Sequence, residues 1–282
     1  MHNTPPASDD LPDAAGDEAA ATPADDISAQ AGDPNFMASL ARGLAVIEAF
    51  SPQRRQMSIS QISQKTGIPR AAVRRCLYTL AKLGFVSAED GRNFALRPRI
   101  LSLGHAYLAS TPLAKAAQPV LRDVSNRLHE SSSIAILDGD EILYIARAST
   151  SRIMTIDLDI GSRLPAVYTS MGRVLLAHLP EDEREACLGR AKLIQYTAHT
   201  LMTVEALRAE LARVRTQGYA VIDQELEIGL RSIAVPIAAP DGQVVAAINV
   251  GLQAARVSVA EMEERILPVL RDAAAELALL LA

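Results

Sequence analysis

Arg70, Arg74 and Arg75 stand close together in the chain, and Tyr78 follows them at helical spacing. A guanidinium group carries a permanent charge and a planar set of donors, so it can clamp a phosphate or bind O6 and N7 of guanine in the major groove. A single arginine on a helix is about as often part of an ordinary solvated surface. The grouping as a whole predicts contacts with duplex DNA.

Two short helices that meet at a corner must hold these side chains. The first covers residues 58–65, and Pro69 opens the second as a first helical residue that lacks a donor. Gly67 between them can adopt the left-handed backbone that a sharp corner requires. Apolar residues at three- and four-residue spacing, among them Val73 and Leu77, can close a small shared core. The pattern predicts a helix-turn-helix.

A hairpin follows the second helix. Apolar residues at 85–86 and 94–96 flank a turn at 89–91, which favours two strands of a wing. Arg92 then lies at the tip of the wing, near a phosphate.

A further helix precedes the pair, over residues 39–50. Ser39 is its predicted cap, and Leu40 and Leu44 belong to the apolar stripe that should face the core. Arg42 on this helix can reach the DNA backbone. The residues predicted to contact DNA are Arg42, Ser58, Arg70, Ala71, Arg74, Arg75, Tyr78 and Arg92.

The charge distribution supports a DNA-binding segment. Residues 39–110 contain eleven basic and three acidic residues, a net charge of +8, whereas the chain as a whole has a net charge of −5. A basic segment that coincides with a helix-turn-helix pattern is typical of a protein that binds duplex DNA.

The chain outside this segment limits the other classes. Residues 1–34 contain eight acids and no Lys or Arg, so we expect this tail to be disordered. A secretory signal and an apolar run of eighteen residues are both missing from the sequence, which predicts a cytoplasmic protein without a membrane partner. Two cysteines and five histidines without metal-ligand spacing predict neither a disulfide framework nor a zinc site, and we expect no cofactor.

Beyond the wing, Pro98 starts a helix too apolar for a solvated linker. It must pack against the following domain or against the same helix of a second subunit. The second arrangement would pair two helix-turn-helix units. The Thr111-Pro112 step then ends the helix and can act as a hinge.

Helices and strands alternate from residue 113 onward. Helices are expected at 113–129, 171–178, 181–189, 204–217 and 261–282, and strands at 133–137, 142–148, 153–158, 219–222, 231–238 and 244–250. Thr169 or Ser170 can cap the helix that runs to residue 178. This α+β arrangement predicts a mixed, mainly antiparallel sheet with helices on one side and a sensory pocket at its open face.

Several of these segments together resemble the IclR family of transcriptional regulators. The resemblance rests on SLARGLAVIEAF, TGIPRAAVRRCLYTLAKLGFV, LPAVYTSMGRVLLA, DQELEIGLRSIAVPI and VVAAINV, and it runs from about residue 36 to the C-terminus. The segments SMGRVLLA and DQELEIGLRSIAVP are similar in sequence to the branch of the family that senses protocatechuate or 4-hydroxybenzoate. This branch controls aromatic catabolism by the β-ketoadipate route.

The resemblance implies a winged helix-turn-helix, a linker helix used in dimerisation and a GAF-like effector domain, assembled as a homodimer or tetramer. The predicted domains are an acidic disordered tail (1–35), the winged helix-turn-helix (36–97), the linker helix and hinge (98–112) and the GAF-like effector-binding and oligomerisation domain (113–282). An activator is favoured over a repressor, with RNA polymerase as a further candidate partner. A repressor that responds to another small organic acid is the alternative.

An aromatic carboxylate effector requires a cation or several N–H donors, apolar walls and a polar group for its hydroxyls, because unpaired buried polar atoms are costly. The free N–H groups at the start of the helix after Thr169 also suit an anion. Arg152 and Arg163 are alternative sources of the cation. The resemblance places nine effector-binding residues in one pocket: Leu164, Tyr168, Thr169, Ser170, Met171, Asp223, Glu225, Ser232 and Asn249. Arg152 and Arg163 complete the predicted set as the two alternatives for the cation.

Several of these residues can instead have a structural role that involves no effector. Tyr168 can equally be a core residue whose hydroxyl reaches a backbone carbonyl, and Asp223 with Glu225 can form a solvated turn. An enzyme with a Ser, His and Asp set is a different class, but the sequence contains no G-x-S-x-G elbow, phosphate loop or dinucleotide fingerprint. A DNA-binding protein without a ligand is the third class.

Overall fold

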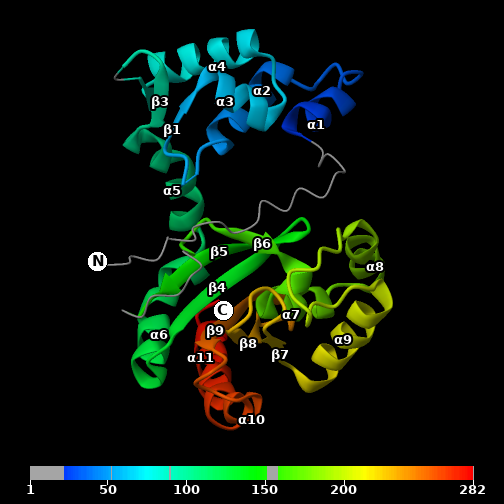
Figure 1. The fold of residues 1–282 in the computed structure, drawn as a ribbon. Coiled ribbons are helices and arrows are strands. Elements are labelled where there is room, and N and C mark those ends of the chain that lie inside the picture. The colour runs from blue at the N-terminus through cyan, green and yellow to red at the C-terminus, as the bar shows by residue number, and fades with distance from the viewer. Residues whose placement is uncertain (1–21, 52, 89, 151–157, 282) are drawn as a thin grey trace, which may run out of the picture. The chain divides into compact units, whose positions relative to one another are not determined.

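The computed structural model describes residues 22–51, 53–88, 90–150 and 158–281 (Figure 1). The chain divides into two compact units, Met1–His105 and Ala106–Ala282. Each unit has its own hydrophobic core.

The first unit is a winged helix-turn-helix. Its elements are α1 (Pro23–Ala29), α2 (Ala38–Glu48), β1 (Gln56–Ser58), α3 (Ile59–Thr66), α4 (Arg70–Lys82), β2 (Val86–Ser87), β3 (Asn93–Leu96) and η1 (Pro98–Ile100). Helices α2, α3 and α4 enclose a core that includes Val46, Ile62, Val73 and Leu77. The strands form an antiparallel sheet in the order β1-β3-β2, so the predicted hairpin gains a third strand from ahead of α3.

The corner between α3 and α4 has the predicted geometry. Gly67 caps α3 with φ +71°, in the left-handed region. The Ser58 hydroxyl accepts a hydrogen bond from the Gln61 amide at the start of α3, as part of a capping box. Pro69 stands one position earlier than predicted, as the residue before the first turn of α4.

Two predictions for the first unit were wrong. Helix α2 is preceded by Met37 rather than capped by Ser39, and Leu40 and Leu44 are exposed. The buried face carries Ala45, Val46 and Ala49 instead, because small side chains let α2 pack closely against α4.

The acidic tail was expected to be disordered as far as residue 35, but residues 23–29 form α1. Thr22 and Asp25 make a reciprocal capping box, and Pro23 occupies the first turn. Ala24 and Ile27 pack against the core of the unit. Local capping and these apolar contacts outweigh the unfavourable composition. Residues 1–21 lie outside the described part of the chain.

The second unit is built on a six-stranded sheet with the order β6-β5-β4-β9-β8-β7. The strands are β4 (Ser131–Asp138), β5 (Glu141–Ala148), β6 (Arg163–Pro165), β7 (Ala220–Asp223), β8 (Leu230–Ala238) and β9 (Val244–Gln253). All five pairings between the described strands are antiparallel, and the predicted α+β class is confirmed. The strand expected at 153–158 falls almost wholly outside the described residues.

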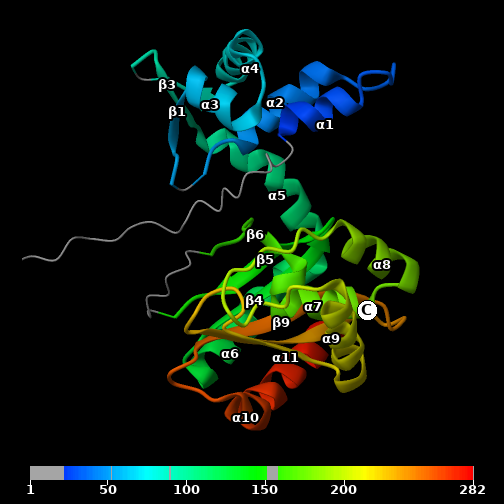
Figure 2. The same ribbon diagram turned by 45° about the vertical axis from the view of Figure 1, so that its right-hand side comes forward.

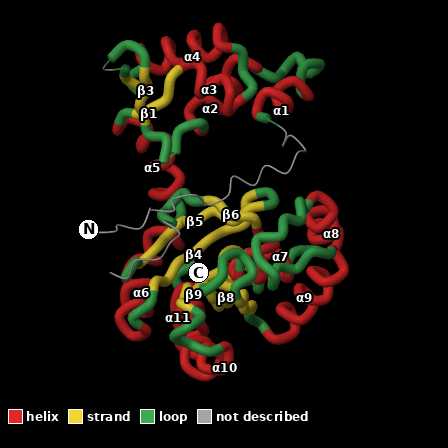
Figure 3. The backbone as a smooth tube through the Cα atoms, in the orientation of Figure 1, coloured by secondary structure: helices red, strands yellow, loops and turns green. Residues whose placement is uncertain are grey.

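Helices cover both faces of this sheet, and not one side as predicted (Figure 2; Figure 3). The helices after the wing are α5 (Leu101–Ser110), α6 (Pro112–Leu128), η2 (Ala166–Tyr168), α7 (Ser170–His178), α8 (Glu181–Arg190), α9 (Val204–Gln217), α10 (Val259–Glu261), the π-helical turn η3 (Met262–Ile266) and α11 (Leu267–Leu279). Helices α6 and α11 pack on one face together with Ile134 and Ile248. Helix α7, with α9 behind it, packs on the other face against Ala135 and Ala247. Neighbouring residues of one strand thus enter different cores, as the period of two requires.

In the part of the chain that the structure describes, no helix combines the length and the apolar composition needed to cross a bilayer.

Substitution of Gly67 tests the corner. A Cβ atom at this position would stand 2.5 Å from Thr22 Oγ1, in a backbone conformation that L-residues rarely adopt. We expect Gly67→Ala to lower the free energy of unfolding by at least about 1–2 kcal/mol, measured by urea denaturation. The matched control is Gly43→Ala in α2, where a Cβ meets nothing within 4 Å. This change should stabilise the protein by about 0.5–1 kcal/mol. Equal effects of the two changes would contradict the strain at Gly67.

Candidate functional site

One face of α4 presents the predicted DNA-contacting residues. Arg70, Ala71, Arg74 and Tyr78 are exposed, and Val73 lies buried on the opposite side. The residues 70, 74 and 78 follow one another every four positions and so lie along one stripe of the helix. Within the described residues, neither Arg70 nor Arg74 has an acidic partner, so both charges are available for phosphates. The Lys82 ammonium lies 5.5 Å from the centre of the Tyr78 ring and adds to the positive charge of this stripe.

Arg75 and Arg42 lie beside this stripe. Both line the groove between α2 and α4, together with Leu44 and Leu83. Arg75 is exposed, so it can still reach a phosphate beside α4. A contact of either arginine with DNA stays a prediction.

The wing holds Arg92 in an exposed turn. The Asp90 carboxylate accepts hydrogen bonds from the backbone N–H groups of Arg92 and Asn93, at 2.9 and 2.7 Å. These bonds hold the pKa of Asp90 below its usual range, and Gly91 beside it has φ +67°. The Arg92 side chain is exposed at the tip, as predicted. The Ser58 hydroxyl is already engaged as the cap of α3, and its predicted DNA contact is untested.

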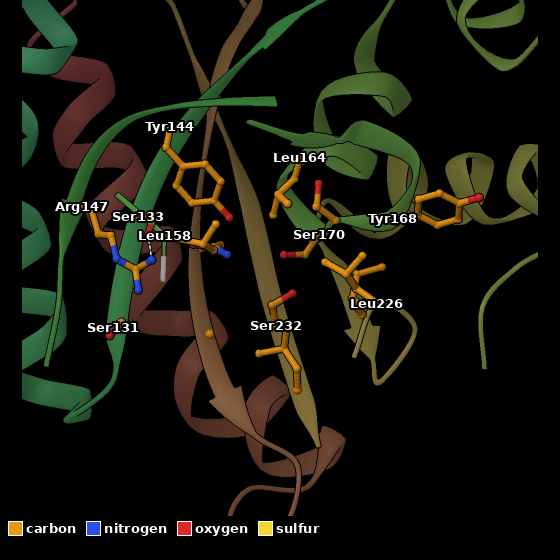
Figure 4. Close-up of a pocket in the computed structure, with 15 residues that line it drawn as sticks. Ser131, Ser133, Tyr144, Arg147, Leu158, Leu164, Tyr168, Ser170, Leu226 and Ser232 are labelled. Carbon is orange, nitrogen blue, oxygen red and sulfur yellow. Dashed lines mark hydrogen bonds between the residues drawn. The ribbon is translucent and has the colours of Figure 1, made fainter. Parts of the chain in front are cut away.

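The second unit contains a cavity between its sheet and the start of α7 (Figure 4). The cavity is lined by Ser131, Ser133, Tyr144, Arg147, Leu158, Leu164, Tyr168, Thr169, Ser170, Ile222, Leu226, Leu230, Ser232, Asn249 and Gly251. Its volume is about 50 Å³. For comparison, an apolar cavity of roughly 150 Å³ holds benzene, so this cavity is smaller than one known to accommodate a ring.

Arg147 supplies the cation of this cavity. Its Nη1 atom donates to Ser133 Oγ at 3.1 Å, and its Nε atom donates to Ser149 Oγ at 3.1 Å. Both partners are neutral, and no carboxylate among the described residues pairs with the guanidinium. An uncompensated charge at a cavity of this kind is suited to an anionic ligand.

A β-bulge explains why this arginine was missed in the sequence. The pairing of β4 with β5 shifts between Ile134 and Ala135, so that Ile134 pairs with Ala146 while Ala135 pairs with Tyr144. In a regular strand Tyr144 and Arg147, three positions apart, would point to opposite faces. The extra residue of the bulge lets both side chains line the same cavity.

Ser170 and Tyr144 are buried residues, and each places at the cavity a hydroxyl group that has no hydrogen-bond partner among the described residues. Ser170 is 1% exposed, and its Oγ atom is a buried side-chain oxygen left unpaired. Tyr144 is 4% exposed, and burial raises the pKa of its phenol to about 12, so it stays protonated at neutral pH. Both can bind polar groups of a ligand.

The structure brings six predicted effector residues to the cavity and leaves four elsewhere. Those at the cavity are Leu164, Tyr168, Thr169, Ser170, Ser232 and Asn249. The Tyr168 side chain nevertheless points away, and its hydroxyl donates to the Lys192 carbonyl and accepts from the Ile194 amide, as the core role of this residue predicted. The Thr169 hydroxyl caps α7 by accepting from the Gly172 amide. Arg152 lies outside the described residues.

The four displaced residues have other partners. Arg163 pairs on the surface with Asp138 and with Glu141, the latter at 3.2 Å. The Asp223 carboxylate binds Arg231, whose guanidinium holds the pKa of this carboxyl below its usual range. Met171, itself a residue of α7, is buried in the core between α7 and the sheet, and Glu225 binds a different arginine, Arg173. In each case a nearby partner, which the sequence could not reveal, removes the side chain from the cavity. No cluster of His, Cys, Asp or Glu in the described residues could hold a metal ion.

The two units each match a family description. Residues 39–90 match the IclR helix-turn-helix domain, and residues 105–279 match the bacterial transcriptional regulator IclR C-terminal domain. The chain belongs to the IclR family. The predicted family is thereby confirmed, and this IclR regulator binds DNA through its helix-turn-helix unit.

Named relatives agree with the predicted branch. The IclR regulator is 55% identical over 258 residues to the Pca regulon regulatory protein of Pseudomonas putida, covering 91% of this chain and 88% of that protein. It is 34% identical over 248 residues to the p-hydroxybenzoate hydroxylase transcriptional activator of Acinetobacter baylyi, covering 86% of this chain and 91% of that protein. An IclR homolog from Microbacterium hydrocarbonoxydans, solved in complex with 4-hydroxybenzoate, has a TM-score of 0.75 at 27% identity and covers 86% of this chain and 98% of that one.

A buried ion pair holds the cavity wall of this IclR regulator in place. Arg173, in α7, is 1% exposed, and its Nη1 and Nη2 atoms donate to the two carboxylate oxygens of Glu225 at 2.7 and 2.6 Å. Its Nε atom donates to the Val167 carbonyl of η2 at 2.9 Å. The Glu225 carbonyl and carboxylate also accept from Thr200 Oγ1 and the Leu201 amide, respectively. The pair thus joins α7 to the loop between β7 and β8, which carries Leu226.

Replacement of Arg74 tests whether the exposed stripe of α4, with residues 70, 74 and 78, binds DNA. We expect Arg74→Ala to weaken operator binding by about tenfold and to reduce the slope of log K against log salt by about 1, because one phosphate contact is lost. Electrophoretic mobility shifts at several salt concentrations measure both quantities. The matched control, Arg127→Ala in α6, removes an exposed arginine of the other unit and should leave DNA binding unchanged. An equal loss of DNA and effector affinity in Arg74→Ala would refute a division of labour between the units.

Replacement of Arg173 tests the buried pair. Arg173→Met leaves Glu225 as an unpaired buried charge, so we expect it to lower the free energy of unfolding by about 3–5 kcal/mol, measured by urea denaturation. The double variant Arg173→Met/Glu225→Leu should recover most of this loss, because no charge is then stranded. Removal of the exposed Arg208–Glu185 pair is the control and should change stability little. A double variant no more stable than Arg173→Met would contradict this assignment.

Proposed function

We propose that this IclR regulator controls genes of aromatic catabolism and that its effector is a small aromatic carboxylate, protocatechuate or 4-hydroxybenzoate. The Arg147 guanidinium, which pairs with no carboxylate among the described residues and lines the cavity beside leucine side chains and hydroxyl groups, carries the proposal. The effector carboxylate takes Arg147 as its partner, in place of the predicted Arg152 or Arg163. The names of the relatives, with their references to the pca regulon and to p-hydroxybenzoate, support the same ligand class.

Effector binding changes the protein because the cavity is too small for the ring. The ligand must displace lining side chains, among them Leu226 in the loop after β7 and Leu230 at the start of β8, and this loop is joined to α7 through the Arg173–Glu225 pair. The ligand therefore favours a conformation with a wider cavity, and the difference in its affinity for the two conformations drives the response. The Thr111-Pro112 step between α5 and α6 is the proposed hinge that transmits it to the DNA-binding unit.

The regulator acts as a homodimer or tetramer, in which two reading heads bind a two-fold operator. Leu101, Leu103 and Tyr107 of α5 are exposed at 72%, 54% and 46%. These exposed apolar side chains support a subunit contact that buries them. The protein is cytoplasmic, performs no covalent chemistry, and activates transcription with RNA polymerase as a partner. A repressor that responds to another small organic acid is the alternative.

Calorimetric titration of Arg147→Met tests the effector site. The wild-type protein should bind protocatechuate or 4-hydroxybenzoate but not an aliphatic acid of similar charge. Arg147→Met should weaken binding by about 10- to 100-fold, since a hydrogen bond to a charged group contributes about 1.5–3 kcal/mol. The matched control is Arg163→Met, which removes an arginine that is paired away from the cavity and should leave affinity unchanged. Binding of the aliphatic acid alone would refute the proposed ligand class.

A further inference from the structure

Ser170 is placed in the cavity wall without a hydrogen-bond partner. It lies at the first position of α7, with 1% of its surface exposed, and its Oγ atom lines the cavity. Among the described residues that are not exposed, this is the one buried side-chain N or O atom left unpaired. An unpaired buried hydroxyl costs about 1–3 kcal/mol, so a ligand that pairs with Ser170 Oγ gains free energy from this hydrogen bond.

The neighbouring residues prevent Ser170 from pairing within the protein. A serine in a helix commonly donates to the carbonyl four residues earlier, which here is that of Ala166. This carbonyl already accepts from the Thr169 amide and lies close to Thr169 Oγ1, at 3.3 and 3.4 Å. Gly172 packs so tightly against Ala166 that a Cβ would stand 2.1 Å from its oxygen. The start of α7 therefore cannot shift to find another partner.

The hydroxyl lies across the cavity from the cation. In Figure 4, Arg147 projects from one side, and Ser170 and Ser232 lie on the opposite side with Tyr144 between them. An aromatic acid that places its carboxylate on Arg147 directs the far edge of its ring toward these serines. A ring without a hydroxyl would leave Ser170 unpaired, whereas a ring hydroxyl can pair with it.

We infer that Ser170 is a specificity-determining residue, whose hydroxyl forms a hydrogen bond with a ring hydroxyl of the effector and so selects hydroxylated benzoates over benzoate. This inference rests on the proposed function, because it requires an aromatic carboxylate in the cavity. Arg173 and Thr169 act as positioning residues, since they hold the start of α7 through the Val167 carbonyl and the Gly172 amide.

Titration of four ligands into two proteins tests the inference. Protocatechuate, 4-hydroxybenzoate, 3-hydroxybenzoate and benzoate are each titrated calorimetrically into the wild-type protein and into Ser170→Ala. In the wild-type protein, at least one hydroxylated acid should bind about tenfold or more tightly than benzoate. In Ser170→Ala this advantage should fall to less than about threefold, while the affinity for benzoate stays equal or rises.

Stability and a control variant separate this role from a structural one. Ser170→Ala without ligand should unfold at the same temperature as the wild-type protein or higher, because the lost hydroxyl had no partner. The control is Ser125→Ala in α6, where a buried hydroxyl is paired with Ser132 Oγ and the Ala148 carbonyl. This change should lower the unfolding temperature and leave the ratio of ligand affinities unchanged.

The outcomes distinguish the inference from the function on which it rests. If the wild-type protein binds no aromatic acid, the proposed function is wrong and the inference falls with it. If it binds these acids and Ser170→Ala weakens benzoate and the hydroxybenzoates by the same factor, Ser170 binds the carboxylate and the inference alone is overturned. An unchanged preference for hydroxylated acids in Ser170→Ala overturns it equally.

Discussion

A guanidinium group that is almost completely buried must have anionic or carbonyl partners, because an unpaired charge in the interior is among the costliest defects of a fold. Arg173 meets this requirement with Glu225 and the Val167 carbonyl. These partners belong to segments far apart in the sequence, namely η2 and the loop after β7. The hydrogen bonds of this one arginine fix the start of α7 and the loop after β7, which together enclose the cavity.

Two polar groups at the cavity, by contrast, lack anionic or carbonyl partners among the described residues. Among these residues, the cation of the cavity has no carboxylate partner and one buried serine hydroxyl has no hydrogen-bond partner, and the cavity volume is about 50 Å³. A pocket that was already filled and paired would gain little from a ligand. In the proposed function, the effector pairs with these groups and moves the lining apart, so part of its binding free energy is available to change the conformation.

Arginines serve three purposes in this chain, and their surroundings distinguish them. Arg173 is buried and paired, which makes it structural. Arg147 lies at the cavity with only neutral partners, which suits a carboxylate ligand. Arg70 and Arg74 are exposed on α4 without acidic partners among the described residues, which suits the phosphates of DNA. Residue type alone cannot separate these roles, because each depends on which groups lie within a few ångströms.

Local chemistry allowed the sequence by itself to determine the helix-turn-helix, the wing and most helices and strands of the second unit, although β6 was not predicted. The left-handed Gly67, the cap at Thr169 and the turn at Gly139 act within a few residues, so their effect is visible in the chain. Tertiary structure alone decided the composition of the cavity. A single bulged residue in β5 brought Arg147 to it, and long-range ion pairs withdrew Asp223 and Glu225. The packing of α1 on the first unit was likewise hidden, because the apolar contacts that stabilise this acidic helix come from residues distant in the sequence.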